Sequence, residues 1–117
     1  MKKVYIAGPY TSKKGVEGED ENVAIAAEVA YRYLVEGWAP FCPHTMTRDI
    51  DRQYNTEGFL TWEDWLMTDL AWLACCDAIH MLPNWRQSKG ATLEYMVAKA
   101  LGLEILGSDL DDADNIN

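Results

Sequence analysis

The sequence predicts an α/β fold, an open parallel sheet of four to five strands with helices on both faces. Short apolar runs suited to strands alternate with stretches whose apolar residues recur at helical spacing. The connections between them are short, as in strand–helix–strand crossovers. The apolar run 77–82 is almost continuous, which is typical of a strand buried on both faces of a parallel sheet. Such sheets bind ligands beyond the carboxyl ends of their strands.

The first predicted strand is Val4–Ala7, which the turn dipeptide Gly8-Pro9 ends. Residues 10–21 are polar and contain two glycines, so we expect a mobile loop there. A helix is expected over 22–36, because its apolar residues follow helical spacing and Gly37 is a natural C-terminal stop.

The remaining elements alternate in the same way. They are a strand at 38–42, a loop at 44–58, a helix at 61–75, a strand at 77–82, a loop at 83–89, a helix at 90–101 and a strand at 103–106. The final residues carry four Asp in ten positions. We therefore expect one domain over 1–107 and an acidic, mobile tail over 108–117.

Composition narrows the class of protein. The 117 residues suffice for one core, and 49% hydrophobic with 25% charged residues is ordinary for a globular chain. No apolar run approaches the roughly 18–20 residues of a membrane span, and the first strand follows Met1-Lys2-Lys3 at once, so a cytoplasmic protein is expected. The net charge of −9 argues against a nucleic-acid polymer as partner. Three cysteines without metal-ligand spacing argue against a disulfide framework and a zinc site.

The segment Ser88–Glu94 is the first candidate for chemistry. Ser88 can cap the following helix, and Gly90 lets a ligand approach the free N–H groups of the first turn. Glu94 lies one turn further in, where the helix end favours an ionised carboxylate that can act as nucleophile or stabilise a cationic transition state. Spacing alone leaves open the alternative that Glu94 is a surface helix residue.

Asp69 is the second candidate, because it shares a helix face with Trp65 and Trp72. Burial against aromatic rings would raise its pKa and suit it to proton transfer. Two carboxylates at one site suggest acid/base or glycosidic chemistry. The alternative is a structural ion pair with one of three arginines, Arg48, Arg52 or Arg86.

Other residues at the strand ends are open to two interpretations. His44, after the second strand, is either part of the site or a packed loop histidine, whereas His80 inside a strand is expected to be structural. Five aromatic residues are either a stacking wall for a flat base or core residues: Tyr5, Tyr10, Trp62, Trp65 and Trp85. The glycine fingerprints of NAD and ATP sites are absent from the sequence.

Three segments resemble the nucleoside 2-deoxyribosyltransferase superfamily. Residues 5–9 (Tyr-Ile-Ala-Gly-Pro) are similar to its first strand and turn, and residues 68–73 followed by Cys76-Asp77 resemble the helix and strand that carry its Asp. Ser88-x-Gly90-x-x-x-Glu94 resembles its nucleophile segment. The match covers about residues 4–106, with the segments in the expected order and spacing.

Within the superfamily, the nearest pattern is a group of small, often phage- or bacterial-encoded domains of unassigned function, whose Leu-Pro-x-Trp-x-x-Ser-Lys-Gly-Ala signature recurs at 82–91. The next nearest is the 2'-deoxynucleoside 5'-monophosphate N-hydrolases, which share the Asp-Leu-x-Trp-Leu pattern found at 69–73. In those hydrolases the first loop bears glycine and arginine, a role that residues 11–15 would have to fill here.

The resemblance implies a flavodoxin-like (Rossmann-like) fold, no metal or organic cofactor, and a homodimer or larger homo-oligomer. It implies Glu94 as nucleophile at the anomeric carbon and Asp69 as general acid/base or sugar-orienting group. Ser88, with the backbone of Gly90 and Ala91, would hold a 5'-phosphate or 5'-hydroxyl. The remaining expected substrate-binding residues are Tyr5, Gly8, Pro9, Tyr10, His44 and Trp85.

The expected function is cleavage of the N-glycosidic bond of a (2'-deoxy)nucleoside 5'-monophosphate or nucleoside. Hydrolysis is slightly favoured over base exchange because the 69–73 pattern lies with the hydrolases. The alternatives are a nucleotide-binding module without turnover, a nucleoside 2-deoxyribosyltransferase, and a structural dimer with a vestigial site.

Overall fold

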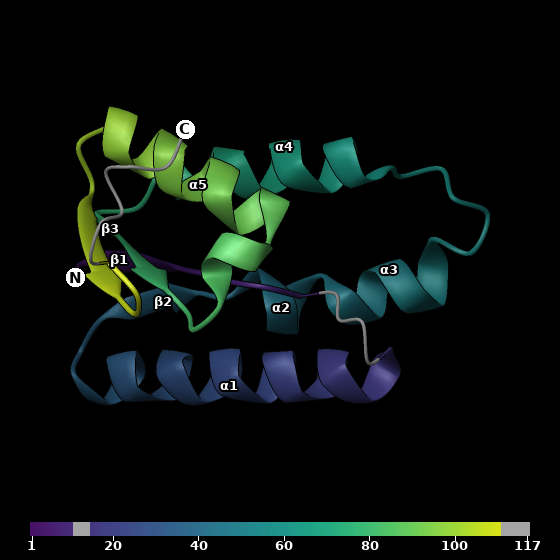
Figure 1. Ribbon diagram of the computed structural model, residues 1–117, viewed down its shortest axis with the longest axis horizontal. Helices are drawn as coiled ribbons and strands as arrows, with labels where there is room; N and C mark the ends of the chain where they lie inside the picture. Colours follow the sequence, from purple (N-terminus) through teal and green to yellow (C-terminus); the bar gives the residue numbers. More distant parts are fainter. Residues whose placement is uncertain (11–14, 111–117) are drawn as a thin grey trace.

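The computed structural model describes residues 1–10 and 15–110, and these form a four-stranded, all-parallel sheet with helices on both faces (Figure 1). The strands are β1 (Lys3–Ala7), β2 (Ala39–Phe41), β3 (Ala78–Met81) and β4 (Glu104–Gly107), in the order β2–β1–β3–β4. The register places Tyr5 of β1 between Phe41 of β2 and Ile79 of β3. The predicted flavodoxin-like α/β fold is therefore confirmed.

The helices lie in two layers around this sheet. They are α1 (Val16–Val35), α2 (Pro43–Met46), α3 (Arg48–Tyr54), α4 (Trp62–Leu73) and α5 (Lys89–Ala100), with a short 3₁₀ turn η1 (Trp85–Gln87) before α5. Figure 1 shows α1 on one face of the sheet and α4 and α5 on the other. No helix within the described ranges has the length and apolar composition to cross a bilayer.

The alternation of side chains along β1 explains the two layers. Val4 and Ile6 join the apolar cluster that includes Ala26 of α1, whereas Tyr5 joins the cluster of Leu73 and the inner face of α5. Successive residues of a strand point to opposite faces, so β1 serves both cores. Tyr5 is thereby placed on the α4–α5 side, where the candidate site lies.

Helix α1 begins at Val16, so the predicted loop over 10–21 is wrong for its second half. The first turn carries Glu17 and Glu19, and acidic side chains there are favoured by the positive end of the helix dipole. Apolar residues follow helical spacing only from Val23 onward, so the start of this helix was predicted too late in the sequence. The predicted loop positions 11–14, and the tail positions 111–117, lie outside the described residues.

The predicted loop over 44–58 is also wrong, because it contains most of α2 and all of α3. Thr47, between the two, has helical angles (φ −101°, ψ −16°). Its N–H donates to the carbonyl of Pro43 (2.9 Å), and its own carbonyl accepts from the N–H of Asp51 (2.9 Å). Thr47 therefore joins two short helices, Pro43–Met46 and Arg48–Tyr54. No residue of α3 is buried, so the segment lacks the apolar stripe that marks a helix in sequence.

Gly8, directly after β1, is required by close packing. A Cβ atom at this position would lie 2.6 Å from Cβ of Leu82, which is too short for any real contact. We expect Gly8→Ala to lower the free energy of unfolding by about 1–3 kcal/mol, measured by denaturant titration, because overpacking forces the backbone apart.

Gly90→Ala is the matched control for Gly8→Ala. Its added methyl would lie 3.9 Å from Trp62 and 4.0 Å from the Ser88 hydroxyl, both ordinary contact distances, and alanine favours a helix over glycine, so stability should stay equal or rise. Equal stability of the two variants would contradict the packing argument.

Candidate active site

A cavity of about 450 Å³ opens at the carboxyl ends of β1 and β2, between the α2–α3 segment and the α4–α5 pair. Its lining from the end of β1 includes Tyr5, Gly8 and Tyr10. The α2–α3 wall includes Pro43, His44, Thr47, Arg48, Asp51 and Asn55. The opposite wall includes Trp62, Trp65, Leu66, Asp69, Ser88, Gly90, Ala91 and Glu94. The structure thus brings most of the predicted site residues to one cavity, at the edge of the sheet where the fold class predicts a ligand.

Glu94 is buried in this cavity with 7% of its surface exposed, so the alternative of a surface helix residue is wrong. The Ser88 hydroxyl caps α5 by accepting from the N–H of Ala91 (3.1 Å), which confirms the predicted helix start. Glu94 follows in the second turn. The phenol of Tyr5, itself fully buried, donates a hydrogen bond to Oε2 of Glu94.

Asp69 projects from α4 into the same cavity. Its Oδ1 is buried and has no hydrogen-bond partner among the described residues. Arg48 and Arg52 do not neutralise it, because the first pairs with Asp20 and the second with Glu19. Two of the predicted alternative ion pairs of Asp69 are therefore wrong.

Burial raises the pKa of both carboxyl groups. Desolvation raises the pKa of Asp69 to about 6. Desolvation also raises the pKa of Glu94 to about 8; the Tyr5 hydrogen bond opposes this rise, and the charge of Asp69 adds to it. Coupled groups titrate as a pair, so near neutral pH the two carboxyls together hold about one proton. One carboxylate and one carboxylic acid are what a retaining glycosidic cleavage requires.

His44 lies at the start of the α2–α3 wall, and its side chain is buried, with 6% of the residue exposed. Its Nε2 lies 2.9 Å from the carbonyl of Pro9, and because a carbonyl only accepts, Nε2 is the donor. Burial lowers the pKa of the imidazole despite hydrogen bonds to the backbone of Pro9 and Gly8. The ring is therefore neutral, with Nδ1 as a bare acceptor. Both sequence-based readings apply, since His44 is packed and also lines the cavity.

Three buried side-chain polar atoms lack a hydrogen-bond partner within the described part of the chain. They are Nδ1 of His44, Nε of Arg48 and Oδ1 of Asp69, and all three residues line the cavity. Unpaired buried polar atoms are costly, and native proteins keep them mainly where function requires it. This coincidence makes the cavity the candidate site for a polar ligand.

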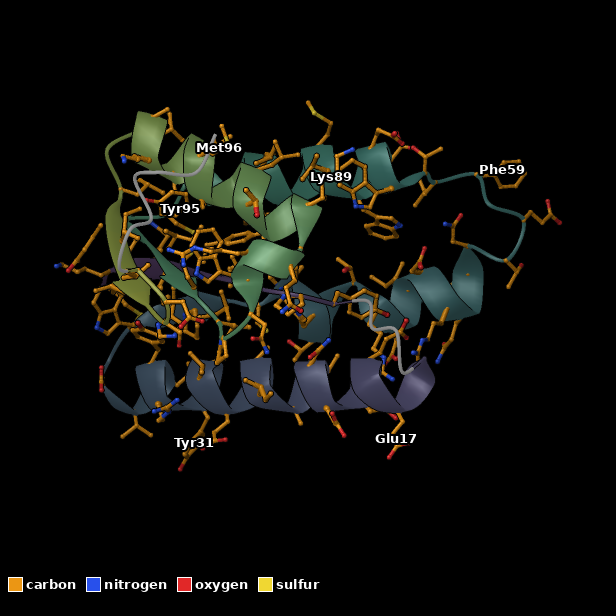
Figure 2. All side chains as sticks on the ribbon, viewed as in Figure 1. Glu17, Tyr31, Phe59, Lys89, Tyr95 and Met96 are labelled. Carbon is orange, nitrogen blue, oxygen red and sulfur yellow. The ribbon has the colours of Figure 1, made fainter. Side chains whose placement is uncertain are left out.

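Trp85 does not line the cavity, contrary to expectation. Its side chain is fully buried, its ring stacks on Tyr95 (centroids 4.9 Å apart; Tyr95 is labelled in Figure 2), and Nε1 donates to the carbonyl of Ser108 at 3.0 Å. Asn84, in the left-handed conformation (φ 65°), directs the chain at this turn. Pro9 also lies outside the lining and contributes only its carbonyl to His44.

Trp62 and Trp65 are the tryptophans that line the cavity. Trp62 is half-exposed, and the ammonium of Lys89 lies 4.9 Å from the centroid of its ring (Lys89 is labelled in Figure 2). Trp65 donates its indole N–H to Oδ1 of Asp51 at 2.9 Å, which ties α4 to α3.

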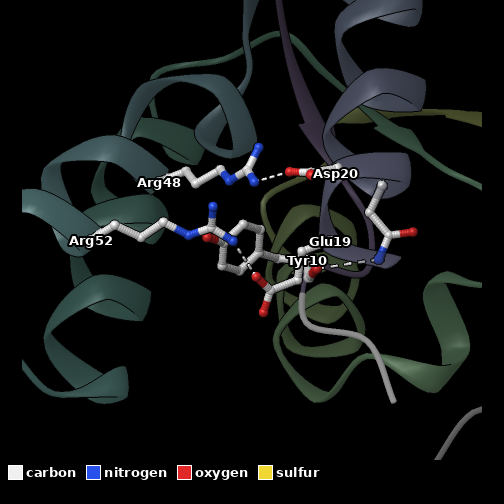
Figure 3. A network of polar contacts seen from close by, with 6 residues as sticks. Tyr10, Glu19, Asp20, Arg48 and Arg52 are labelled. Carbon is white, nitrogen blue, oxygen red and sulfur yellow. Dashed lines mark hydrogen bonds and ion pairs between the residues drawn. The ribbon is translucent and has the colours of Figure 1, made fainter. Parts of the chain in front are cut away.

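The polar residues of α3 are the part of the site that the sequence reasoning missed. Arg48, Asp51 and Asn55 recur at helical spacing after His44, and this periodicity was the available signal. Figure 3 shows how α3 is anchored, with Arg48 paired to Asp20 and Arg52 to Glu19 of α1 beside the ring of Tyr10.

The chain is similar in fold to a 2-deoxyribosyltransferase of known structure. A solved structure of the 2-deoxyribosyltransferase from the psychrotolerant bacterium Bacillus psychrosaccharolyticus matches with a TM-score of 0.59 and 17% sequence identity, covering 98% of this chain and 92% of that one. At this identity the likeness establishes the fold, and it confirms the resemblance expected from the sequence.

The chain belongs to the family described as Domain of unknown function (DUF4406), whose model matches residues 2–107. A comparison with curated proteins gives no match.

Within the described ranges, no group of three or more His, Cys, Asp or Glu residues is placed to hold a metal ion. The polar groups that line the cavity include the carboxyls of Glu94 and Asp69, the Tyr5 phenol, the His44 imidazole and the Arg48 guanidinium. These groups can move protons, form a covalent ester and bind polar groups of a ligand.

Proposed function

We propose that this protein cleaves the N-glycosidic bond of a (2'-deoxy)nucleoside or its 5'-monophosphate, with Glu94 as nucleophile. The observation that carries the proposal is that the buried Glu94 and the half-buried Asp69 line one cavity, with the Tyr5 phenol bonded to Glu94. The neighbour in fold is named as a 2-deoxyribosyltransferase, which agrees with a nucleoside as substrate class.

In the first step, an ionised oxygen of Glu94 bonds to C1' of the sugar while the bond from C1' to the base nitrogen breaks. The electron pair of that bond leaves with the base, which takes a proton from Asp69. The Tyr5 phenol holds Oε2 of Glu94, so the other oxygen is the one that attacks. Positive charge that develops on the sugar favours the microstate with Glu94 ionised and the proton on Asp69.

In the second step, water attacks C1' and the glycosyl ester of Glu94 is released. Asp69, now ionised, accepts the proton of that water, and the carboxyl pair returns to its starting state. A second base in place of the water would give base exchange. We favour water because residues 69–73 carry the Asp-Leu-x-Trp-Leu pattern of the nucleotide hydrolases.

The start of α5 is the proposed site for the 5' end of the substrate. Ser88 accepts from Ala91 and keeps its own O–H free to donate, and Gly90 leaves the backbone accessible. N–H groups of the first helical turn favour an anion such as a phosphate. Trp62 and Trp65 offer flat surfaces for the base or sugar.

A nucleotide-binding module without turnover is the second candidate. The three unpaired polar atoms of the cavity support binding and cleavage equally, since they would pair with a polar ligand whether or not that ligand is cleaved.

The test is incubation of the protein with each deoxynucleoside and its 5'-monophosphate, with and without a second base, followed by chromatography for free base. An acid quench and peptide mass spectrometry then locate a glycosyl adduct. We expect free base and an adduct on the peptide that contains Glu94. An adduct on Asp69 would contradict the nucleophile assignment, and calorimetric binding of an intact nucleotide without any base release would establish the module instead.

A further inference from the structure

The α2–α3 wall of the cavity is formed by two short helices separated by Thr47. His44, Arg48, Asp51 and Asn55 follow one another at four, three and four residues, and all of them line the cavity. His44 of α2 and Arg48 of α3 therefore contribute to the same cavity from either side of Thr47.

Most polar groups of this wall are already bonded within the protein. The Thr47 hydroxyl donates to the carbonyl of Pro43 at 2.9 Å. The Asn55 amide donates to Asp51 (2.9 Å) and to the carbonyl of Leu60 (2.8 Å), and its oxygen accepts from the N–H of Leu60 (2.9 Å). These residues hold the wall in shape.

His44 and Arg48 each keep one buried atom unpaired within the described residues. Nδ1 of His44 is an acceptor, because Nε2 carries the proton that is donated to Pro9. Nε of Arg48 is a donor, and its guanidinium is held from the other end by the ion pair of a terminal nitrogen with Asp20. The wall therefore presents one acceptor and one donor to the same cavity.

We propose that this pair reads the polar edge of a lactam nucleobase, with His44 accepting from the ring N–H and Arg48 donating to the adjacent carbonyl oxygen. The inference rests on the proposed function, since it names the base that the same cavity would take. Guanine, hypoxanthine, thymine and uracil present this N–H and C=O side by side. In protein–DNA complexes arginine commonly donates to the O6 carbonyl oxygen of guanine, whereas adenine is more often bound by Asn or Gln.

The local charge favours a neutral edge over a phosphate at this wall. Asp20 already neutralises Arg48, and Glu19 neutralises Arg52 (Figure 3). A phosphate here would have to displace a carboxylate from its ion pair, whereas a carbonyl needs only the unused Nε–H. The phosphate is assigned instead to the α5 end of the cavity.

The test is calorimetry in the Glu94→Gln background, where the ligand stays intact. The probes are 2'-deoxyguanosine 5'-monophosphate and its N1-methyl derivative, thymidine 5'-monophosphate and its N3-methyl derivative, the adenine and cytosine monophosphates, and the two unphosphorylated lactam nucleosides. We expect a lactam nucleotide to bind best, and methylation of its N–H to weaken binding about tenfold or more, because Nδ1 of His44 is then left unpaired.

Two variants test the roles of His44 and Arg48 separately. His44→Gln keeps an amide donor for Pro9 but leaves no acceptor at the Nδ1 position, so it should bind the methylated and unmethylated probes within about threefold of each other. Arg48→Lys keeps the charge beside Asp20 but loses Nε–H, so it should weaken nucleoside and nucleotide by the same factor. Asp49→Asn, on the exposed side of α3, is the matched control and should change nothing.

Three results would each overturn the inference. The adenine or cytosine nucleotide could bind most tightly, or the protein that retains His44 could bind methylated and unmethylated probes equally. The third is that Arg48→Lys weakens the binding of phosphorylated probes only. In those cases base release by the wild-type protein still supports the proposed function. Absence of both base release and nucleotide binding in the wild-type protein would overturn the two together. The methylated probes need no change at His44, so they decide the question even if His44→Gln does not fold.

Discussion

Replacing Glu94 with glutamine is expected to lower kcat/KM for base release by at least about 10³-fold, since loss of a covalent nucleophile removes the pathway and leaves only binding and orientation. Glutamine keeps the shape and can still accept from the Tyr5 phenol, so the cavity should remain intact. The measurement is steady-state release of free base at pH 7. Glu63→Gln, an exposed carboxyl on α4, is the matched control and should leave the rate unchanged. A Glu94→Gln rate within tenfold of wild type would exclude Glu94 as nucleophile.

The same substitution should stabilise the protein at alkaline pH. Burial raises the pKa of Glu94 from 4.5 to about 8, so between these values the folded state holds a proton that the unfolded state has lost. The stability contribution of this group is complete below pH 4.5 and is lost as pH rises through 8. Each pKa unit corresponds to about 1.4 kcal/mol, so glutamine should gain on the order of 2–4 kcal/mol at pH 8.

Denaturant titrations of both proteins at pH 5 and pH 8 measure this gain. The difference between wild type and Glu94→Gln should be small at pH 5 and large at pH 8. The two histidines affect the pH dependence of stability in the opposite direction. Burial lowers the pKa of His44 and of His80 below 6.5, so their contribution to the free energy of unfolding is lost as pH falls. A Glu94→Gln protein less stable than wild type at pH 8 would contradict the burial of an uncompensated carboxyl.

The sequence predicted those parts of the site that depend on local chemistry. Ser88 caps α5 as its residue type and position indicate, and Glu94 follows one turn later because helical spacing is fixed. The meeting of Asp69 with Glu94 follows from the parallel sheet and from the family resemblance together.

Helix α3 was missed because its stability comes from long-range polar contacts. Arg48 and Arg52 pair with residues 28 and 33 positions away, and Asp51 accepts from Trp65 on α4. Such contacts leave no stripe of buried apolar residues in the sequence, so the sequence of a polar helix of this kind predicts a loop. The sequence did not predict the base-binding role proposed for His44 and Arg48 for the same reason.

Trp85→Ala is expected to lower the free energy of unfolding by about 3–5 kcal/mol, the usual cost of removing a fully buried tryptophan from a core. The loss combines the stacking on Tyr95, the cavity left beside it, and the bond from the indole N–H to Ser108. Trp62→Ala is the matched comparison, because Trp62 is half-exposed and lines the cavity, so it should cost little stability and weaken nucleotide binding. Denaturant titration and calorimetry on both variants separate the two roles. A Trp85→Phe protein with full stability but impaired nucleotide binding would restore Trp85 as a ligand contact, as the sequence had suggested, and would require the indole to leave the core when the ligand binds.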